Sequence, residues 1–296
     1  MNKYKVIALS VSGRSNKVYK SGDEVDENKF LPGMAEKLCE LKFLERVYAE
    51  NLKPEIAFPI VGRLKLAIVT AVWKRPEVFE LFAKGIHALT VNTAIDIYVI
   101  VAGSEGKASQ KMVEKHGFIY VEVPNEPLAT KVNQPVLIAK RLKVDYVLCL
   151  GSDDLISIEL LKVYEEYMRK GIDFIAVTDF YFYDMESKKA AYWGGYTENW
   201  RKGHTAGAGR LLSKRLLNYW DWKPWEIKDS KILDTSIQNK LKITPHSSMI
   251  FSLKDKGVFA LDIKSETNMT PFKLWDNTRF VPVETIKKHF PYVCAE

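Results

Sequence analysis

The strongest constraint on the fold of this chain is a regular alternation of short apolar segments with amphipathic segments between residues 64 and 150. The apolar segments predict strands at residues 64–73, 95–102, 118–123 and 145–150. The amphipathic segments predict helices at residues 76–89, 107–116 and 134–142. Strands that are apolar on both faces and separated by helices indicate a parallel sheet covered on both sides.

This alternation predicts one large α/β domain over residues 61–296, with halves at 61–155 and 156–296. In the second half the alternation weakens after a helix and a strand, and Trp, Tyr, Gly and basic residues become frequent. Residues 1–60 predict a small α+β domain followed by a linker that contains two prolines.

The composition excludes several classes of protein. With 47% hydrophobic and 27% charged residues in 296, the chain has enough apolar material for a core and is not disordered. No apolar run approaches the roughly 20 residues that span a bilayer, so we expect no membrane insertion. The apolar run near the first residue is too short for a signal peptide, so we expect a cytoplasmic location. Three scattered cysteines without C-x-x-C spacing imply neither disulfides nor a zinc site.

Two adjacent carboxylates, Asp153 and Asp154, follow the predicted strand at 145–150. In sheets of this kind, ligands bind outside the carboxyl ends of the strands. Paired carboxylates there suit Mg²⁺ or Mn²⁺, which prefer oxygen ligands and can bridge to a diphosphate. The alternative is that one Asp only caps the helix that follows.

With this Asp pair at the strand end, residues 64–154 resemble the nucleotide-binding half of a GT-A-fold glycosyltransferase of the family-two type, of the kind that phages encode. The resemblance extends to about Leu241 and implies a GT-A-type, Rossmann-like mixed sheet with flanking helices. It implies that residues 61–155 bind the donor and residues 156–296 the acceptor. The implied reaction is transfer of a hexose or pentose from a nucleotide-diphosphate sugar, most simply a UDP-sugar, to a hydroxyl. The implied cofactor is Mn²⁺ or Mg²⁺.

The metal-binding D-x-D motif of that family is altered in this chain. Gly151 stands in place of the first Asp, Ser152 is the spacer, and Asp153 takes the metal position with Asp154 beside it. The contacts that the first Asp makes in the family would therefore fall to Asp154 or Ser152. His246 is a candidate third metal ligand, as a late histidine is in some relatives, although lone histidines are usually structural.

The resemblance also implies donor-binding residues at other strand ends. Thr70, Val72 and Arg75 match the loop that holds the nucleoside in the family. Lys131 and Asn133 precede the predicted helix at 134–142, where amides and a cation can together hold an anion. Arg75 and Lys131 could equally be solvated residues at helix starts.

Three candidates remain on the acceptor side. Arg210 follows a pair of glycines and could pair with donor phosphate or an anionic acceptor. Asp234 matches the position at which the family carries the base that deprotonates the acceptor, and Asp179 is the reserve candidate. The alternative for Asp234 is a helix N-cap.

Other functions stay open from the sequence. A net charge of +7 with basic pairs and many aromatic residues would also suit a nucleic-acid-binding protein, and a nucleotidyltransferase uses a similar sheet with carboxylates. A transferase that modifies DNA bases would combine both features, in the host cytoplasm if phage-encoded, so modified DNA and a glycan are both candidate acceptors. The aromatic residues that could form a stacking wall, or only a core, are Trp193, Tyr196, Trp200, Trp220, Trp222 and Trp225.

Overall fold

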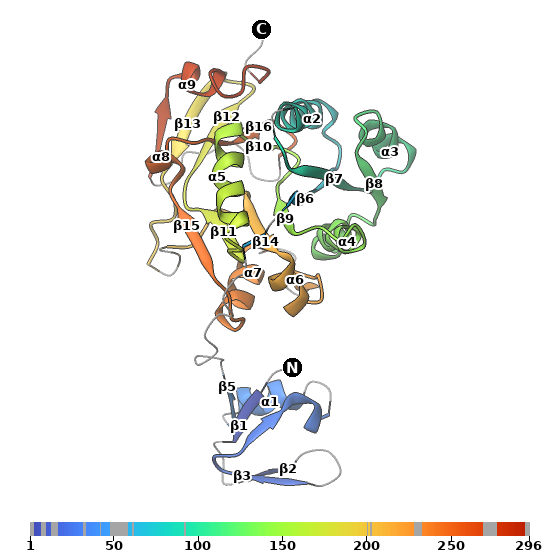
Figure 1. The fold of residues 1–296 in the computed structure, drawn as a ribbon, viewed down its shortest axis with the longest axis vertical. Helices are drawn as coiled ribbons and strands as arrows, with labels where there is room; N and C mark the ends of the chain where they lie inside the picture. Colours follow the sequence, from blue (N-terminus) through green and yellow to red (C-terminus); the bar gives the residue numbers. More distant parts are fainter. Residues whose placement is uncertain are drawn as a thin grey trace. The chain divides into compact units, whose positions relative to one another are not determined.

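A computed structural model describes most of the chain in two compact units, Met1–Glu55 and Ile56–Glu296, each with its own internal contacts (Figure 1). The residues described are 3–6, 10–12, 17–31, 34–41, 43–47, 59–60, 62–91, 93–199, 201, 203–227, 233–268 and 277–293.

The first unit is a small α+β structure. An antiparallel sheet has the order β4-β1-β5, and β2 pairs with β3 in a separate hairpin. Its strands and helix are β1 (Lys3–Val6), β2 (Ser10–Ser12), β3 (Val18–Lys20), β4 (Glu24–Asp26), α1 (Met34–Glu40) and β5 (Leu44–Val47). Alternate strand residues such as Tyr4 and Val6 join Phe30 and Leu44 in a small apolar core.

The second unit is built on a seven-stranded mixed sheet with the order β15-β11-β14-β9-β6-β7-β8. Strand β14 runs antiparallel to both its neighbours, whereas the other pairs are parallel. The strands are β6 (Lys65–Ala71), β7 (Asp96–Gly103), β8 (Ile119–Glu122), β9 (Tyr146–Cys149), β11 (Phe174–Val177), β14 (Arg210–Ser213) and β15 (Ser248–Phe251). The α/β sheet predicted from the sequence is confirmed.

Helices cover both faces of this sheet because its strands are apolar on both sides. Residues of α2 (Pro76–Thr90), α3 (Lys107–Glu114) and α5 (Ile158–Arg169) pack in the core on one face. Residues of α4 (Leu128–Arg141), α6 (Lys214–Tyr219) and α7 (Leu233–Lys242) pack on the other. Helix α4 begins at Leu128 and runs through Pro135, so the predicted start near residue 134 was too late. Pro135 therefore lies in the interior of α4 and not in its first turn.

A second, five-stranded sheet has the order β10-β16-β12-β13-β17 and shares its core with the α2 and α5 face of the large sheet. Its strands are β10 (Asp154–Ile156), β12 (Phe180–Asp184), β13 (Lys189–Trp193), β16 (Ala260–Lys264) and β17 (Thr278–Val281). The short helix α8 (Leu253–Lys256) precedes β16, and the short helix α9 (Val283–Lys287) follows β17. Strand β10 directly follows β9, so the chain passes from one sheet to the other at the Asp pair.

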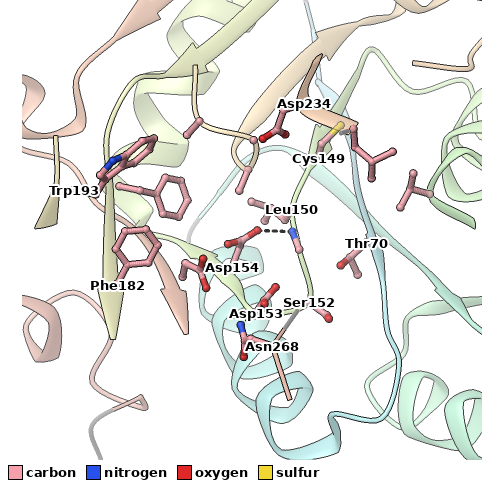
Figure 2. Close-up of a pocket in the computed structure, with 18 of the residues that line it drawn as sticks. Thr70, Cys149, Leu150, Ser152, Asp153, Asp154, Phe182, Trp193, Asp234 and Asn268 are labelled. Carbon is pink, nitrogen blue, oxygen red and sulfur yellow. Dashed lines mark hydrogen bonds between the residues drawn. The ribbon is translucent and has the colours of Figure 1, made fainter. Parts of the chain in front are cut away.

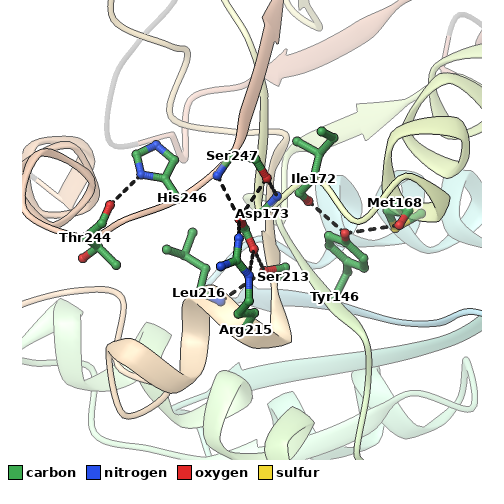
Figure 3. Close-up of polar contacts among 10 residues, drawn as sticks. All are labelled: Tyr146, Met168, Ile172, Asp173, Ser213, Arg215, Leu216, Thr244, His246 and Ser247. Atoms are coloured by element: carbon green, nitrogen blue, oxygen red, sulfur yellow. Dashed lines mark hydrogen bonds and ion pairs between the residues drawn. The ribbon is translucent and has the colours of Figure 1, made fainter. Parts of the chain in front are cut away.

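A buried carboxylate fastens three segments of the large sheet together (Figure 3). Asp173, before β11, accepts hydrogen bonds from Ser213 Oγ at 2.8 Å, from Ser247 N at 2.8 Å and from Arg215 Nε at 2.9 Å. Its side chain is buried, and the donors come from two other stretches of chain, residues 213–215 and residue 247. These charged and neutral donors offset the free-energy cost of burying the carboxylate. Without the carboxylate, each donor would lose its hydrogen-bond partner.

Replacing this carboxylate should therefore destabilise the second unit. We expect Asp173→Asn to lower the free energy of unfolding by about 3 kcal/mol, because it leaves Arg215 without its charge partner in a buried network. Urea denaturation followed by circular dichroism measures the change. The same substitution at exposed Asp255 is the control and should cost less than about 0.5 kcal/mol. Equal stability of the two variants would contradict the role given to Asp173.

Candidate active site

A cavity of about 820 Å³ lies at the carboxyl ends of β6 and β9, beside the second sheet (Figure 2). Its lining joins residues that are far apart in the sequence: Thr70 and Arg75 after β6, residues 149–154 after β9, Asp234 at the start of α7, and Asp262 on β16. Parallel strands end at a common edge, which is why the cavity forms there. Of the predicted site residues, the structure brings Thr70, Arg75, Ser152, Asp153, Asp154 and Asp234 to this cavity.

Three carboxylates interact on the cavity wall. Strands β10 and β16 pair antiparallel with Asp154 directly opposite Asp262, and Asp153 precedes them. Burial, and then the negative charges of Asp153 and Asp262, raise the pKa of Asp154 well above its ordinary value. Burial and the charge of Asp153 likewise raise the pKa of Asp262 to about 7. The surroundings therefore do not fully compensate the ionised forms of Asp154 and Asp262.

Two cations and one amide hold these carboxylates in place. Arg75 Nη1 donates to Asp153 Oδ2 at 2.7 Å, and Asn268 Nδ2 donates to the same oxygen at 2.7 Å. Lys264 Nζ lies 2.6 Å from Asp262 Oδ2. Three carboxylates thus face two cations, and Asp153 accepts hydrogen bonds from both Arg75 and Asn268. Asp153 and Asn268 are labelled in Figure 2.

The glycine in place of the first Asp of the motif has a steric reason. A Cβ at Gly151 would lie 2.4 Å from Asp153 Oδ1 and 2.7 Å from Asp154 Oδ2. The Asp154 carboxylate folds back to accept the Gly151 N–H at 2.5 Å. Neither Asp caps the next helix, because Ser157 Oγ accepts from Leu160 N at the start of α5. The helix-cap alternative for the Asp pair is therefore wrong.

Several buried polar atoms of the lining have no hydrogen-bond partner in the structure. These atoms are Thr70 Oγ1, Arg75 Nε, Ser152 Oγ and Asp262 Oδ1. The side chains of Thr70 and Ser152 are 4% and 2% exposed, so ordinary solvent does not compensate them well. Buried polar groups are usually satisfied, and a cluster of exceptions around one cavity indicates a place for a polar ligand.

The carboxylates and hydroxyls of the cavity wall are the candidate ligands for a divalent cation. Within the described residues, no group of three or more His, Cys, Asp or Glu side chains is arranged to hold a metal ion. The chemistry still fits a hard cation, because Asp153 and Asp154 offer carboxylate oxygens and Ser152 an unpartnered hydroxyl. Added positive charge would also relieve the repulsion that raises the pKa of Asp154.

Asp234 stands at another part of the cavity (Figure 2), in the first turn of α7. A Cβ at Gly207 would come within 2.3 Å of its Oδ1, so the glycine permits the carboxylate to approach the backbone. Arg210 is 1% exposed, and its Nη1 lies 3.5 Å from Asp234 Oδ1, while its Nε donates to Thr205 Oγ1 at 3.1 Å. Arg210 therefore contacts Asp234 from within the protein interior and does not itself line the cavity.

Three predicted donor ligands, Lys131, Val72 and Asn133, take part in internal hydrogen bonds. Lys131 Nζ donates to Val72 O at 2.8 Å, to Ser104 Oγ at 3.0 Å and to Asn125 Oδ1 at 2.9 Å. Asn133 exchanges two hydrogen bonds with the backbone of Trp225. Lys131 is the fourth and Asn133 the sixth residue of α4, and neither side chain lines the cavity. The anion-binding role expected of them stays a prediction.

The reserve base and the late histidine lie elsewhere. Asp179 accepts hydrogen bonds from Tyr192, Ser252 and two backbone amides at the start of α8, and it does not line the cavity. His246 contacts Thr244 O before β15, at the edge opposite to the cavity, because β15 runs in the same direction as β6 and β9 (Figure 3). The structure does not bring His246 near the Asp pair.

Most of the aromatic residues considered for a stacking wall belong to the core. Trp193, Trp220 and Trp222 are buried, although Trp193 also lines the cavity. Tyr196 packs edge-on against Trp193 and carries the Arg201 guanidinium 3.5 Å above its ring. Trp225 lines the cavity, and Trp200 lies outside the described residues.

The sequence analysis missed Asp262, Lys264 and Asn268. Alternation in β16 puts Ala260, Asp262 and Lys264 on one face of the strand. Charges at alternate positions normally indicate a solvent face, so this pattern by itself points away from a buried site. Only the pairing of β16 with β10 shows that the face borders the cavity.

No protein family and no curated protein sequence matches this chain. Among solved structures, it is similar to S. aureus TarS, with a TM-score of 0.52 and 13% identity over 68% of this chain and 37% of that one. TarS 1-349 in complex with UDP gives a TM-score of 0.46 and 15% identity, over 68% and 61%. A cytidylyltransferase from Leptospira borgpetersenii gives 0.41 and 10%, over 64% and 76%.

The chain therefore spans about three fifths of TarS 1-349 and less than two fifths of the longer TarS chain. At 13% identity the likeness to TarS concerns the fold. The chain has a GT-A-like fold, a mixed sheet with helices on both faces and its cavity at the strand ends.

A side chain at Gly151 should disturb the carboxylate cluster. We expect Gly151→Ala to lower the free energy of unfolding by about 1–3 kcal/mol, because the new methyl group overlaps two carboxylate oxygens. Gly151→Ser should cost at least as much, since it is larger. Thermal melting of both variants provides the measurement. Melting temperatures equal to that of the unchanged chain would show that the carboxylates move aside freely.

Proposed function

We propose that this chain is a glycosyltransferase that moves a sugar from a nucleotide-diphosphate sugar to a hydroxyl acceptor. The observation that carries the proposal is the cavity at the carboxyl ends of β6 and β9, which brings Asp153, Asp154 and Asp234 together with unpartnered buried polar atoms. The GT-A-like fold and the UDP in one TarS structure support a nucleotide donor, with UDP-sugar as the first candidate.

In this proposal Asp234 is the general base. Its side chain is 43% exposed at the cavity, and Arg210 and Gly207 fix its position. The carboxylate would take the proton of the acceptor hydroxyl as the oxygen attacks the anomeric carbon. The bond from that carbon to the diphosphate then breaks on the opposite side, which inverts the configuration.

The donor half would hold the diphosphate. Asp153 and Asp154 would hold Mn²⁺ or Mg²⁺, which when bound supplies positive charge to the leaving diphosphate. Arg75 and Asn268 orient Asp153, and Thr70 and Ser152 offer hydroxyls to the donor from a buried wall. His246 and Asp179 have no part in this proposal, because other contacts hold them outside the cavity.

A thermal-shift screen tests the proposal directly. The probes are UDP, CDP, GDP, ADP and dTDP, with UDP-glucose and UDP-N-acetylglucosamine, each with and without Mn²⁺. At about a hundredfold excess over Kd, a ligand of the native state adds about 2.7 kcal/mol of stability. We expect at least one diphosphate to raise the melting temperature in the presence of Mn²⁺. A chain that none of these compounds stabilises would not be a nucleotide-sugar transferase of this class.

Asp153→Asn should abolish the dependence of donor binding on Mn²⁺ while the chain stays folded. The change removes one negative charge from an oxygen-ligand site and keeps the shape of the side chain. Calorimetric titration of UDP with and without Mn²⁺ measures the loss, with Asp255→Asn as the surface control. Normal Mn²⁺-dependent binding by Asp153→Asn would remove this residue from the metal assignment.

Asp234→Asn should spare donor binding and lower turnover by about 10²–10⁴-fold, the usual contribution of a general base. Release of UDP from a UDP-sugar in the presence of acceptor measures turnover, and calorimetry measures donor affinity. A matching fall in donor affinity would mean that Asp234 is a ligand or a structural residue.

The acceptor hydroxyl belongs to a glycan or to a modified DNA base in this proposal, and salt distinguishes the two. DNA binding should weaken with a log–log slope of about −0.9 for each phosphate neutralised, whereas a neutral glycan should hardly respond. Titration of hydroxymethylated DNA from low to moderate salt gives the slope. Because three of the five candidate stacking residues that the structure describes are buried, we expect weak DNA binding. Tight binding with a steep slope would identify DNA as the acceptor.

A further inference from the structure

Lys264 is a buried cation that neither the sequence motif nor the fold comparison assigns to the site. It closes β16, two residues after Asp262 and on the same face of the strand. The residue is 5% exposed and yet lines the cavity, with Nζ 2.6 Å from Asp262 Oδ2 and 5.4 Å from the centre of the Phe182 ring. Lysines rarely lie this deep, because an ammonium loses its hydration there.

The position of Lys264 follows from strand pairing. Asp154 faces Asp262 across β10 and β16, so Lys264 stands next to the carboxylates that follow β9. The positive charge of Lys264 acts to lower the pKa of both Asp154 and Asp262, against the effect of burial. Arg75, which precedes α2, donates to Asp153 of the same carboxylate cluster. Two cations therefore border the carboxylates, and Ser152 Oγ and Thr70 Oγ1, which are buried without partners, belong to residues that line the same cavity.

We propose that Lys264 is a cationic ligand of the donor diphosphate and stabilises the leaving nucleoside diphosphate. This inference rests on the proposed glycosyl transfer. A bond forms between the acceptor oxygen and the anomeric carbon, and the bond from that carbon to the β-phosphate oxygen breaks. The electron pair stays on the phosphate, the acceptor proton goes to Asp234, and the Lys264 ammonium faces the charge that accumulates on the phosphate.

Asp262 has a positioning role in this arrangement. An ammonium on a flexible four-carbon chain would otherwise reach several carboxylates in the cluster. The ion pair with Asp262 Oδ2, and the Phe182 ring beside the chain, hold it on the cavity wall. The remaining N–H donors of the ammonium can then turn toward a phosphate oxygen.

The test compares nucleotides that differ only in phosphate number. Calorimetry with UDP, UMP and uridine, or the matching series for whichever diphosphate the unchanged chain binds, is done on Lys264→Gln, with Mg²⁺ fixed. We expect the diphosphate affinity to fall about tenfold or more, as when a charged hydrogen bond is lost. The monophosphate should change less, and the nucleoside should not change. Lys264→Arg should restore most of the diphosphate affinity, and Lys256→Gln, at an exposed lysine, should leave all three affinities unchanged.

Removal of one buried charge can also unfold a protein, so Asp262→Asn/Lys264→Gln is measured in parallel, because it removes the ion pair as a unit. It should show the same loss confined to the diphosphate. An unchanged diphosphate affinity in both variants, or an equal loss for all three compounds, would overturn the role of Lys264 and leave the proposed function standing. If the unchanged chain binds no nucleoside diphosphate, the proposed function and this inference both fail.

Discussion

The antiparallel pairing of β10 with β16 is the interaction on which the site depends. The chain leaves the large sheet at Cys149 and enters the second sheet at Asp154, so the Asp pair lies at the junction between the two sheets. Pairing then sets Asp154 opposite Asp262 and places Lys264 at the cavity. A shift of one residue in this register would turn Asp262 and Lys264 to the other face and dissolve the cluster.

This register has an electrostatic cost that the surroundings only partly offset. Asp153 is held by Arg75 and Asn268, and Asp262 by Lys264, but burial and mutual repulsion still raise the pKa of Asp154. A protein gains no stability from a third carboxylate in such a place, because an apolar residue would pack at lower cost. Perturbed carboxylates of this kind are typical of sites whose charge is completed by a ligand.

The parts of the fold and site that depend on residues close together in the sequence could be predicted from the sequence alone. The strand and helix alternation gave the sheet, and the Asp pair after an apolar strand indicated the right edge. Lys131 shows the limit of this reasoning, because a lysine that joins three strand ends and a lysine that binds phosphate look alike in a sequence. Asp262 and Lys264 could not be found either, since the pairing that buries them joins segments more than a hundred residues apart.

The distribution of charge constrains the ligands of the cavity more than the net charge of the chain does. The chain as a whole carries +7, yet among the described residues that line the cavity five are acidic and three are basic. The cavity wall therefore offers a polyanion no excess of positive charge. A donor diphosphate would need positive charge directly against it. In the proposed reaction, Lys264 and Arg75 would supply part of that charge from the protein, and a divalent cation on Asp153 and Asp154 would bring the remainder together with the donor. In the proposed reaction, this wall would favour a neutral hydroxyl compound as the acceptor that reaches Asp234.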